Sequence, residues 1–148
     1  MICRAQKRHI EALHQLLVEN ISGTHPTSAA WLHERLVSSS SIIMIDEEMD
    51  QLVGGIVGLV VMDEAEIHDI AVHAPTRRQG RAARLVQAFE HHASERGVRT
   101  IFLEVRAHNE AAKKLYKKAG FSLQHTRPRY YPDGEDALIF QKKLEAQP

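Results

Sequence analysis

The chain has 148 residues, of which 43% are hydrophobic and 26% are charged. This composition is typical of one globular domain and excludes a disordered or fibrous chain. Its 19 basic and 19 acidic side chains give a formal net charge of zero, which argues against nucleic acid as the main partner. The single cysteine excludes an internal disulfide, and no apolar run is long enough for a membrane span or signal peptide. We therefore expect a single cytoplasmic domain over residues 1–148.

The first half of the chain predicts a short strand, two helices and a hairpin. The strand is expected over residues 1–5, and apolar residues at helical spacing predict a helix over about 8–19. Ser28 is suited to cap the second helix. Two β-branched runs at 42–45 and 52–61 are separated by the acidic segment Asp-Glu-Glu-Met-Asp, which predicts a hairpin with an acidic turn.

The second half of the chain predicts four strands and two further helices. Its strands are expected at 66–72, 100–105, 121–126 and 136–143. One helix should follow Gly80 and stop at Gly97, and a second should run from Asn109 to residue 118. The run 100–105 is nearly continuously apolar, which predicts a strand covered on both faces. The element order β-α-α-β-β-β-α-β-α-β-β indicates a mixed α/β fold with a central strand–helix–strand crossover.

The segment 70–85 has the features of a phosphate-binding loop. A strand ends, Gly80 follows in a short loop, and a helix begins at once. The first amides of a helix have no internal partners and favour negative charge, and glycine lets the backbone close around a phosphate. Four arginines near the helix start would either bind a pyrophosphate or only form a basic, solvent-exposed helix start. They are Arg77, Arg78, Arg81 and Arg84. Neither the Walker nor the Rossmann glycine pattern is present.

The sequence Arg-Arg-Gln-Gly-Arg-Ala at 77–82, directly after Ile-Ala-Val, resembles the Arg/Gln-x-x-Gly-x-Gly/Ala motif of the GNAT superfamily of N-acetyltransferases. The resemblance implies a GNAT fold, with a mixed, mostly antiparallel twisted sheet flanked by about four helices. It also implies that acetyl-CoA binds, its pyrophosphate held by main-chain amides of Arg78, Gln79, Gly80, Arg81, Ala82 and Ala83. The strand residues expected to contact the pantetheine arm and the acetyl group are Ile70, Ala71 and Val72.

A longer match lies at residues 103–121, Leu-Glu-Val-Arg through Gly-Phe. It is similar to the signature of the ribosomal-protein-alanine acetyltransferase (RimI-like) branch, and 129–137 resembles that branch's Tyr-Tyr-Pro…Glu-Asp-Ala tail. The resemblance implies Glu104 as proton acceptor, Asn109 as a CoA contact and Tyr116 as proton donor. A weaker match begins at residue 19, where Thr27 replaces the branch's tryptophan, so the peptide preference is left open.

The same residues have a chemical rationale without the family. Glu104 interrupts an apolar strand on the face of Phe102 and Arg106, so it is either a general base or a partner of Arg106. Asn109 and Tyr116 are two helical turns apart on one face, at about 10 Å. Tyr116 could instead be a ring at the edge of the core.

Further residues are candidates for the acceptor side. Glu66 is a rival base, because histone-type lysine acetyltransferases of the superfamily, which this chain resembles, carry their glutamate near this position. Tyr130 and Tyr131 would either hydrogen-bond a peptide or only pack. The acidic residues Asp63, Glu64 and Glu66 would attract a basic peptide tail or form a solvated turn.

The acceptor is expected to be an α-amine. At pH 7 an α-amino group with pKa about 7.7–8.0 is roughly 10–15% neutral, whereas lysine is below about 0.1% neutral. The branch resemblance implies the N-terminal alanine of a small-subunit ribosomal protein. The alternatives are a small amine or amino acid as acceptor, or a non-catalytic acyl-CoA-binding module. Ten histidines show no zinc-site spacing, so no metal is expected. The oligomeric state is left open.

Overall fold

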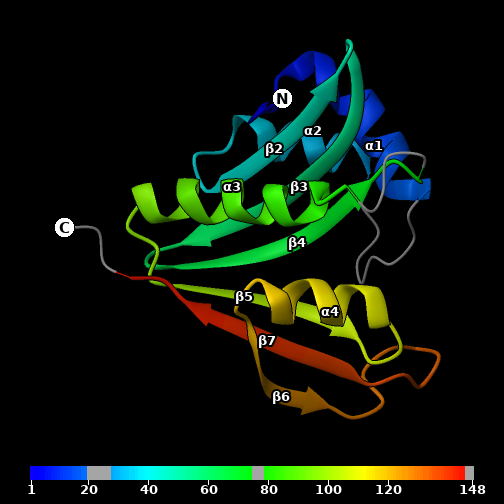
Figure 1. The fold of residues 1–148 in the computed structure, drawn as a ribbon, viewed down its shortest axis with the longest axis vertical. Helices are drawn as coiled ribbons and strands as arrows, with labels where there is room; N and C mark the ends of the chain where they lie inside the picture. Colours follow the sequence, from blue (N-terminus) through cyan, green and yellow to red (C-terminus); the bar gives the residue numbers. More distant parts are fainter. Residues whose placement is uncertain (20–27, 75–78, 146–148) are drawn as a thin grey trace.

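The computed structural model describes residues 1–19, 28–74 and 79–145, which form one seven-stranded sheet and its helices (Figure 1). The strands are β1 Ile2–Arg4, β2 Ser41–Glu48, β3 Gln51–Val61, β4 Glu64–Val72, β5 Thr100–Arg106, β6 Ser122–Arg127 and β7 Ala137–Lys143. The helices are the 3-10 turn η1 Lys7–His9, α1 Ile10–Glu19, α2 Ala29–Val37, α3 Arg81–Glu95 and α4 Glu110–Lys118. Apart from η1, this is the order expected from the sequence.

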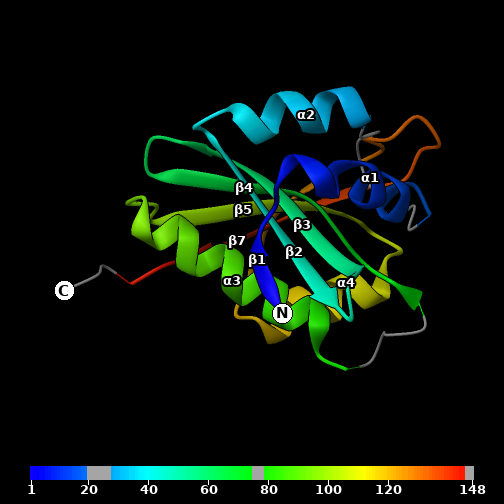
Figure 2. The same cartoon turned by 90° about the horizontal axis from the view of Figure 1, so that it is seen from above.

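The strands lie in the order β1-β2-β3-β4-β5-β7-β6. Only β4 and β5 pair in parallel, and α3 connects them, so the predicted central crossover is confirmed. Helices α3 and α4 cover one face of the sheet, and α1 and α2 cover the other (Figure 2). Each face has its own apolar core, one around Phe89 and Phe140 and one around Leu13 and Leu32. Among the described helices, none is long and apolar enough to cross a membrane.

The acidic segment between β2 and β3 is mostly strand, so the predicted turn was too long. β2 continues to Glu48, and only Met49 and Asp50 turn, with φ of 50° and 62°. Positive φ at both central residues suits a two-residue hairpin turn that follows the twist of the strands. Asp46 is only 2% exposed. A charged residue can be buried in this strand because Arg81, 35 positions away in the sequence, forms an ion pair with the Asp46 carboxylate.

The expectation that β5 is covered on both faces was wrong. Burial alternates along the strand, with Ile101, Leu103 and Val105 buried and the residues between them half-buried. The buried side chains join the core beneath α3 and α4. The other face of β5 carries Phe102 and Glu104, and it borders a groove. An apolar residue at position 102 makes the strand look fully buried in sequence, although this face is open.

A bulge in β4 opens the sheet at its centre. Val57 of β3 pairs with Asp69 and Gly58 pairs with Ile67, so His68 is the extra residue. A bulge bends its strand and increases the local twist. Pairing between β4 and β5 ends at Ile67 opposite Leu103, and beyond this point the two strands diverge (Figure 1). The divergence leaves a cleft between residues 67–70 of β4 and residues 103–105 of β5.

Candidate active site

The cleft between β4 and β5 brings together residues that the sequence analysis selected separately. Its walls include His68 to Ile70 from β4, Glu104 from β5, and Asn109 and Tyr116 from α4. It is narrow, with a volume of about 40 Å³. Ile70 lines the cleft, while the side chains of Ala71 and Val72 are buried in the two cores. β4 pairs with β3 along 70–72 but with β5 only along 64–67, so its other edge at 70–72 is not paired with β5.

Tyr116 lies on the face of α4 that packs against the sheet. The side chain is 4% exposed, and its ring meets Phe121 edge-on at 5.5 Å. Burial raises the pKa of Tyr116 well above its ordinary value, and the Asp69 carboxylate adds to the effect. The phenol therefore keeps its proton at neutral pH. Asn109 begins the same helix, where its side chain accepts a hydrogen bond from Ala112 N at 3.1 Å.

The predicted phosphate loop ends at Gly80, directly before α3. Gly80 has φ of 73°, a left-handed conformation that glycine adopts without strain. The first intrahelical bond runs from Arg84 N to Gly80 O at 3.1 Å. The amides of residues 81–83 therefore come before the first helical donor, as a phosphate site needs. Arg78 and Thr27 lie outside the described residues.

Arg81 directs its side chain to carboxylates of β2, whereas the sequence left open a phosphate contact or a solvated helix start. Its Nη1 donates to Asp46 Oδ2 at 2.9 Å and to Glu48 Oε1 at 3.1 Å, and the side chain is 11% exposed. Arg84 Nη1 likewise bonds a loop carbonyl, that of Gln79, at 2.9 Å. Both guanidiniums thus bond groups of the protein itself.

Asp46 is therefore expected to support the phosphate loop from β2. We expect Asp46→Asn to lower the free energy of unfolding by about 1–3 kcal/mol, because Arg81 loses a charge-assisted hydrogen bond in a half-buried site. Acetyl-CoA affinity should fall several-fold, since Arg81 is the first residue of α3. Denaturant unfolding and calorimetry measure the two effects. Glu48→Gln is the control, because this carboxylate is 48% exposed and its loss should cost under about 1 kcal/mol. Equal effects of the two variants would contradict the assignment.

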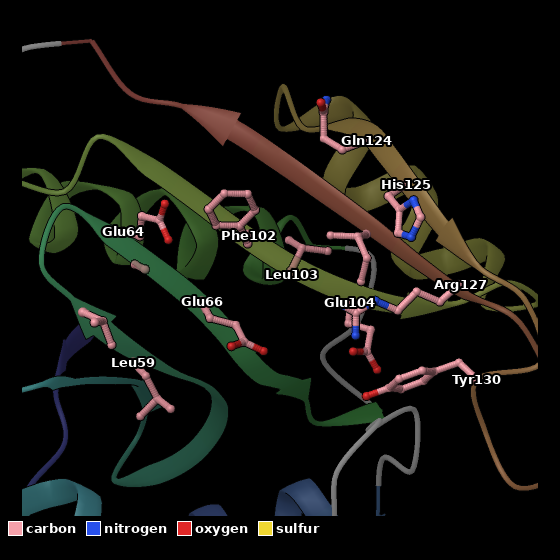
Figure 3. Close-up of a pocket in the computed structure, with 13 residues that line it drawn as sticks. Leu59, Glu64, Glu66, Phe102, Leu103, Glu104, Gln124, His125, Arg127 and Tyr130 are labelled. Atoms are coloured by element: carbon pink, nitrogen blue, oxygen red, sulfur yellow. The ribbon is translucent and has the colours of Figure 1, made fainter.

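A wide groove lies on the open face of β4 and β5, with a volume of about 680 Å³. Glu66 pairs across the strands with Phe102, and Glu104 is two residues further along β5, so all three side chains share this face. Figure 3 shows Glu66, Glu104 and Tyr130 directed into the groove. Tyr130 comes from the loop between β6 and β7 and is 43% exposed. Glu104 lines both the groove and the cleft.

Tyr131 holds the Glu104 carboxylate, a contact that sequence reasoning missed. Its hydroxyl donates to Glu104 Oε1 at 2.6 Å, and the side chain is 5% exposed. Arg106, considered above as the partner of Glu104, lies over the Tyr131 ring at 4.0 Å and bonds Asp133 at 2.9 Å. The Tyr131 amide also donates to Glu135 O at 3.2 Å.

We expect Tyr131→Phe to lower kcat about tenfold while leaving the KM for acetyl-CoA unchanged. The variant keeps the ring beneath Arg106 and removes only the hydroxyl, so Glu104 loses one charge-assisted hydrogen bond. Steady-state kinetics measure the split between kcat and KM. Tyr130→Phe is the comparison, because it removes the hydroxyl of the neighbouring groove tyrosine and leaves the bond from Tyr131 to Glu104 in place. An unchanged kcat in Tyr131→Phe would show that Glu104 is held by other groups.

The fold and these two cavities define the class of protein. The sequence profile of the acetyltransferase (GNAT) family matches residues 10–121. The chain belongs to this family, so both the resemblance seen in the sequence and the predicted GNAT fold are confirmed. In the crystal structure of the ribosomal-protein-S18-alanine N-acetyltransferase from Escherichia coli, a chain 28% identical to this one superposes with a TM-score of 0.86. The superposition covers 100% of this chain and 96% of that one.

Relatives of the chain include proteins named as ribosomal-protein-alanine acetyltransferases. The ribosomal protein bS18-alanine N-acetyltransferase of Escherichia coli is 46% identical over 83 residues, which are 54% of this chain and 56% of that protein. The chain thus matches little more than half of that relative's length. A Bacillus subtilis protein provisionally named for the same activity is 35% identical over 85% of both chains. An aminoglycoside 6′-N-acetyltransferase complexed with coenzyme A has the same fold, at 19% identity, a TM-score of 0.86 and coverage of 100% and 99%.

Proposed function

We propose that this chain transfers an acetyl group from acetyl-CoA to the N-terminal alanine of a small-subunit ribosomal protein. The observation that carries the proposal is the position of Glu104, at the junction of the narrow cleft and the wide groove. An acyl donor in the cleft and an amine in the groove would meet at this carboxylate. The names of the bS18-alanine acetyltransferase relatives support the choice of acceptor.

The described residues fit acetyl-CoA, which when bound supplies a thioester as acyl donor. The helix-start amides at 81–83 and the left-handed Gly80 suit its pyrophosphate. The edge of β4 at 70–72, which is not paired with β5, would offer main-chain amides to the arm and to the thioester oxygen. Such amides stabilise negative charge that develops on a carbonyl oxygen. Asn109, in the cleft wall, is the expected further contact.

Each catalytic side chain has one task in this proposal. Glu104, through a water, removes a proton from the acceptor ammonium, so that the free amine can attack. The hydroxyl of Tyr131 keeps the Glu104 carboxylate at the junction. Tyr116, which lines the cleft, gives its proton to the departing thiolate. The 70–72 edge of β4 holds the carbonyl oxygen while these transfers occur.

Glu66 is the weaker candidate for the base. Both carboxylates line the groove, but only Glu104 also lines the cleft among the residues described there. Glu66 faces Phe102, two positions before Glu104 along β5. Its place further along the groove suits contact with the acceptor chain. We therefore assign Glu104 to proton removal and Glu66 to acceptor binding.

We expect Tyr116→Phe to lower kcat by about tenfold, a smaller loss than a general acid often gives. The leaving thiol has a pKa of about 8.5 if it behaves like cysteine, so it can depart as a thiolate with modest help. Single-turnover acetyl transfer measures the step. The variant should fold normally, because the phenyl ring keeps its contact with Phe121. A wild-type rate would remove Tyr116 from the mechanism.

The chemistry of the acceptor supports an α-amine. One carboxylate at the junction must remove a proton from an ammonium that binds charged. Each pKa unit costs about 1.4 kcal/mol, so a lysine requires about 3–4 kcal/mol more than an α-amine. The volume of the groove, about 680 Å³, also admits several residues of an extended peptide rather than one small amine.

Release of free thiol from acetyl-CoA, followed with three acceptors, tests the proposal. The first is an alanine-starting peptide copied from a small-subunit ribosomal protein, and the second is the same peptide with a blocked N-terminus and an internal lysine. The third is a set of free amines and amino acids. We expect release with the first acceptor alone. Faster turnover of a free amine would point to a small-molecule enzyme, and acetyl-CoA binding without any release would point to a binding module.

A further inference from the structure

A second polar cavity lies far from the active site, at the opposite edge of the sheet. It is bounded by the end of β1, the last turn of α2 and the start of β2, with β3 and β4 between it and β5. Its volume is about 260 Å³, several times the roughly 30 Å³ that one water occupies in the liquid. None of its lining residues belongs to the cleft or to the groove.

Two buried donors in the wall of this cavity lack a hydrogen-bond partner among the described residues. They are Nε of Arg35, on α2, and Oγ of Ser41, the first residue of β2. Ser41 is 5% exposed. Buried polar groups are nearly always hydrogen-bonded, and each exception calls for a partner. A third such atom, Arg81 Nε, differs because the guanidinium of Arg81 already bonds two carboxylates.

The charge of the cavity is positive. Arg4 and Arg35 are among its lining residues, which include no aspartate or glutamate. The charge at the cavity is that of Arg35, because Arg4 pairs with Met44 and so directs its side chain to the α3 side of the sheet. No ion pair of either arginine is found within the part of the chain that the structure describes. A cation in the last turn of α2 offsets the helix dipole, which accounts for the charge of Arg35 but leaves its Nε without an acceptor.

We propose that this cavity binds a small oxyanion, a phosphate or carboxylate group. The planar guanidinium of Arg35 offers Nε and a terminal nitrogen together, the geometry that pairs with two oxygens of such an anion. The Ser41 hydroxyl donates a third hydrogen bond. A bound oxyanion would join α2 to the β1–β2 edge of the sheet. The proposal does not depend on the acetyltransferase function.

Titration of the ¹⁵N-labelled full chain with inorganic phosphate, and separately with citrate, tests the proposal. Amide shifts at Arg35 and Ser41 report this cavity, and those at Gly80 report the phosphate loop. We expect saturable shifts at Arg35 and Ser41, with affinity at least about tenfold weaker in Arg35→Gln and several-fold weaker in Ser41→Ala. The relative affinities for phosphate and citrate distinguish a phosphate ligand from a carboxylate.

Arg99→Gln is the matched control, because Arg99 is an exposed arginine that does not line this cavity and should leave binding unchanged. Acetyl transfer by Arg35→Gln should equal that of wild type, since Arg35 is outside the cleft and the groove, and this shows that the variant folds. Shifts at Gly80 alone, or equal affinity in Arg35→Gln and wild type, would overturn the proposal. So would a high-resolution crystal structure from phosphate buffer showing only water against Ser41.

Discussion

Replacing Glu104 with glutamine should lower kcat/KM for the peptide acceptor by about 10²–10⁴-fold, the usual contribution of a general base. Glutamine keeps the size of the side chain and can still accept the Tyr131 hydrogen bond, but it cannot take a proton. Binding of acetyl-CoA should be unchanged, because the phosphate loop is on another segment of the chain. Steady-state kinetics between pH 6 and 9, with calorimetry for the cofactor, measure both properties.

Glu66→Gln is the matched control for this experiment. The carboxylate lines the groove from β4, so its loss should raise the KM for the peptide and leave kcat nearly unchanged. A Glu104→Gln variant that keeps the full rate across this pH range would move proton removal to Glu66. Loss of kcat in both variants would indicate that the two carboxylates act together.

Adding a single methyl group at Gly58 should destabilise the protein by about 1–3 kcal/mol or more. A Cβ at this position would lie 2.3 Å from the Phe89 ring and 2.6 Å from the Glu66 carbonyl oxygen. Phe89 is fully buried and the carbonyl belongs to the backbone, so neither can move cheaply. Because Gly58 faces the β4 bulge, the substitution should also disturb the divergence that forms the cleft.

Thermal unfolding measures the effect of Gly58→Ala, with an expected fall in Tm of roughly 3–10 °C. Gly54→Ala, on the same strand, is the control. There the nearest atom to the new methyl is Leu85 Cδ1 at 3.0 Å, the flexible end of a side chain. We expect a change below about 1 kcal/mol at Gly54. A similar fall in Tm in the two variants would mean that the structure accommodates a methyl group beside Phe89 and the bulge as easily as at Gly54.

The helices and strands were largely predictable because their signals are local. Ser28 caps α2 by accepting a hydrogen bond from Trp31 N at 3.0 Å, and Asn109 caps α4 in the same way. Both contacts join residues three apart, which sequence spacing encodes directly. The buried stripe of α3, including Leu85 and Phe89, follows from helical periodicity alone.

The sequence by itself determined the element order, the caps and the residue types of an acyl-transfer site. The tertiary structure decided which of these residues meet. Tyr131 and Glu104 are 27 positions apart, and Arg81 and Asp46 are 35 apart, so each pairing depends on how distant strands align. A shift of one residue in register exchanges the faces of a strand, and the His68 bulge sets where β4 leaves β5. Such register is fixed by packing over the whole sheet, and no local pattern carries it.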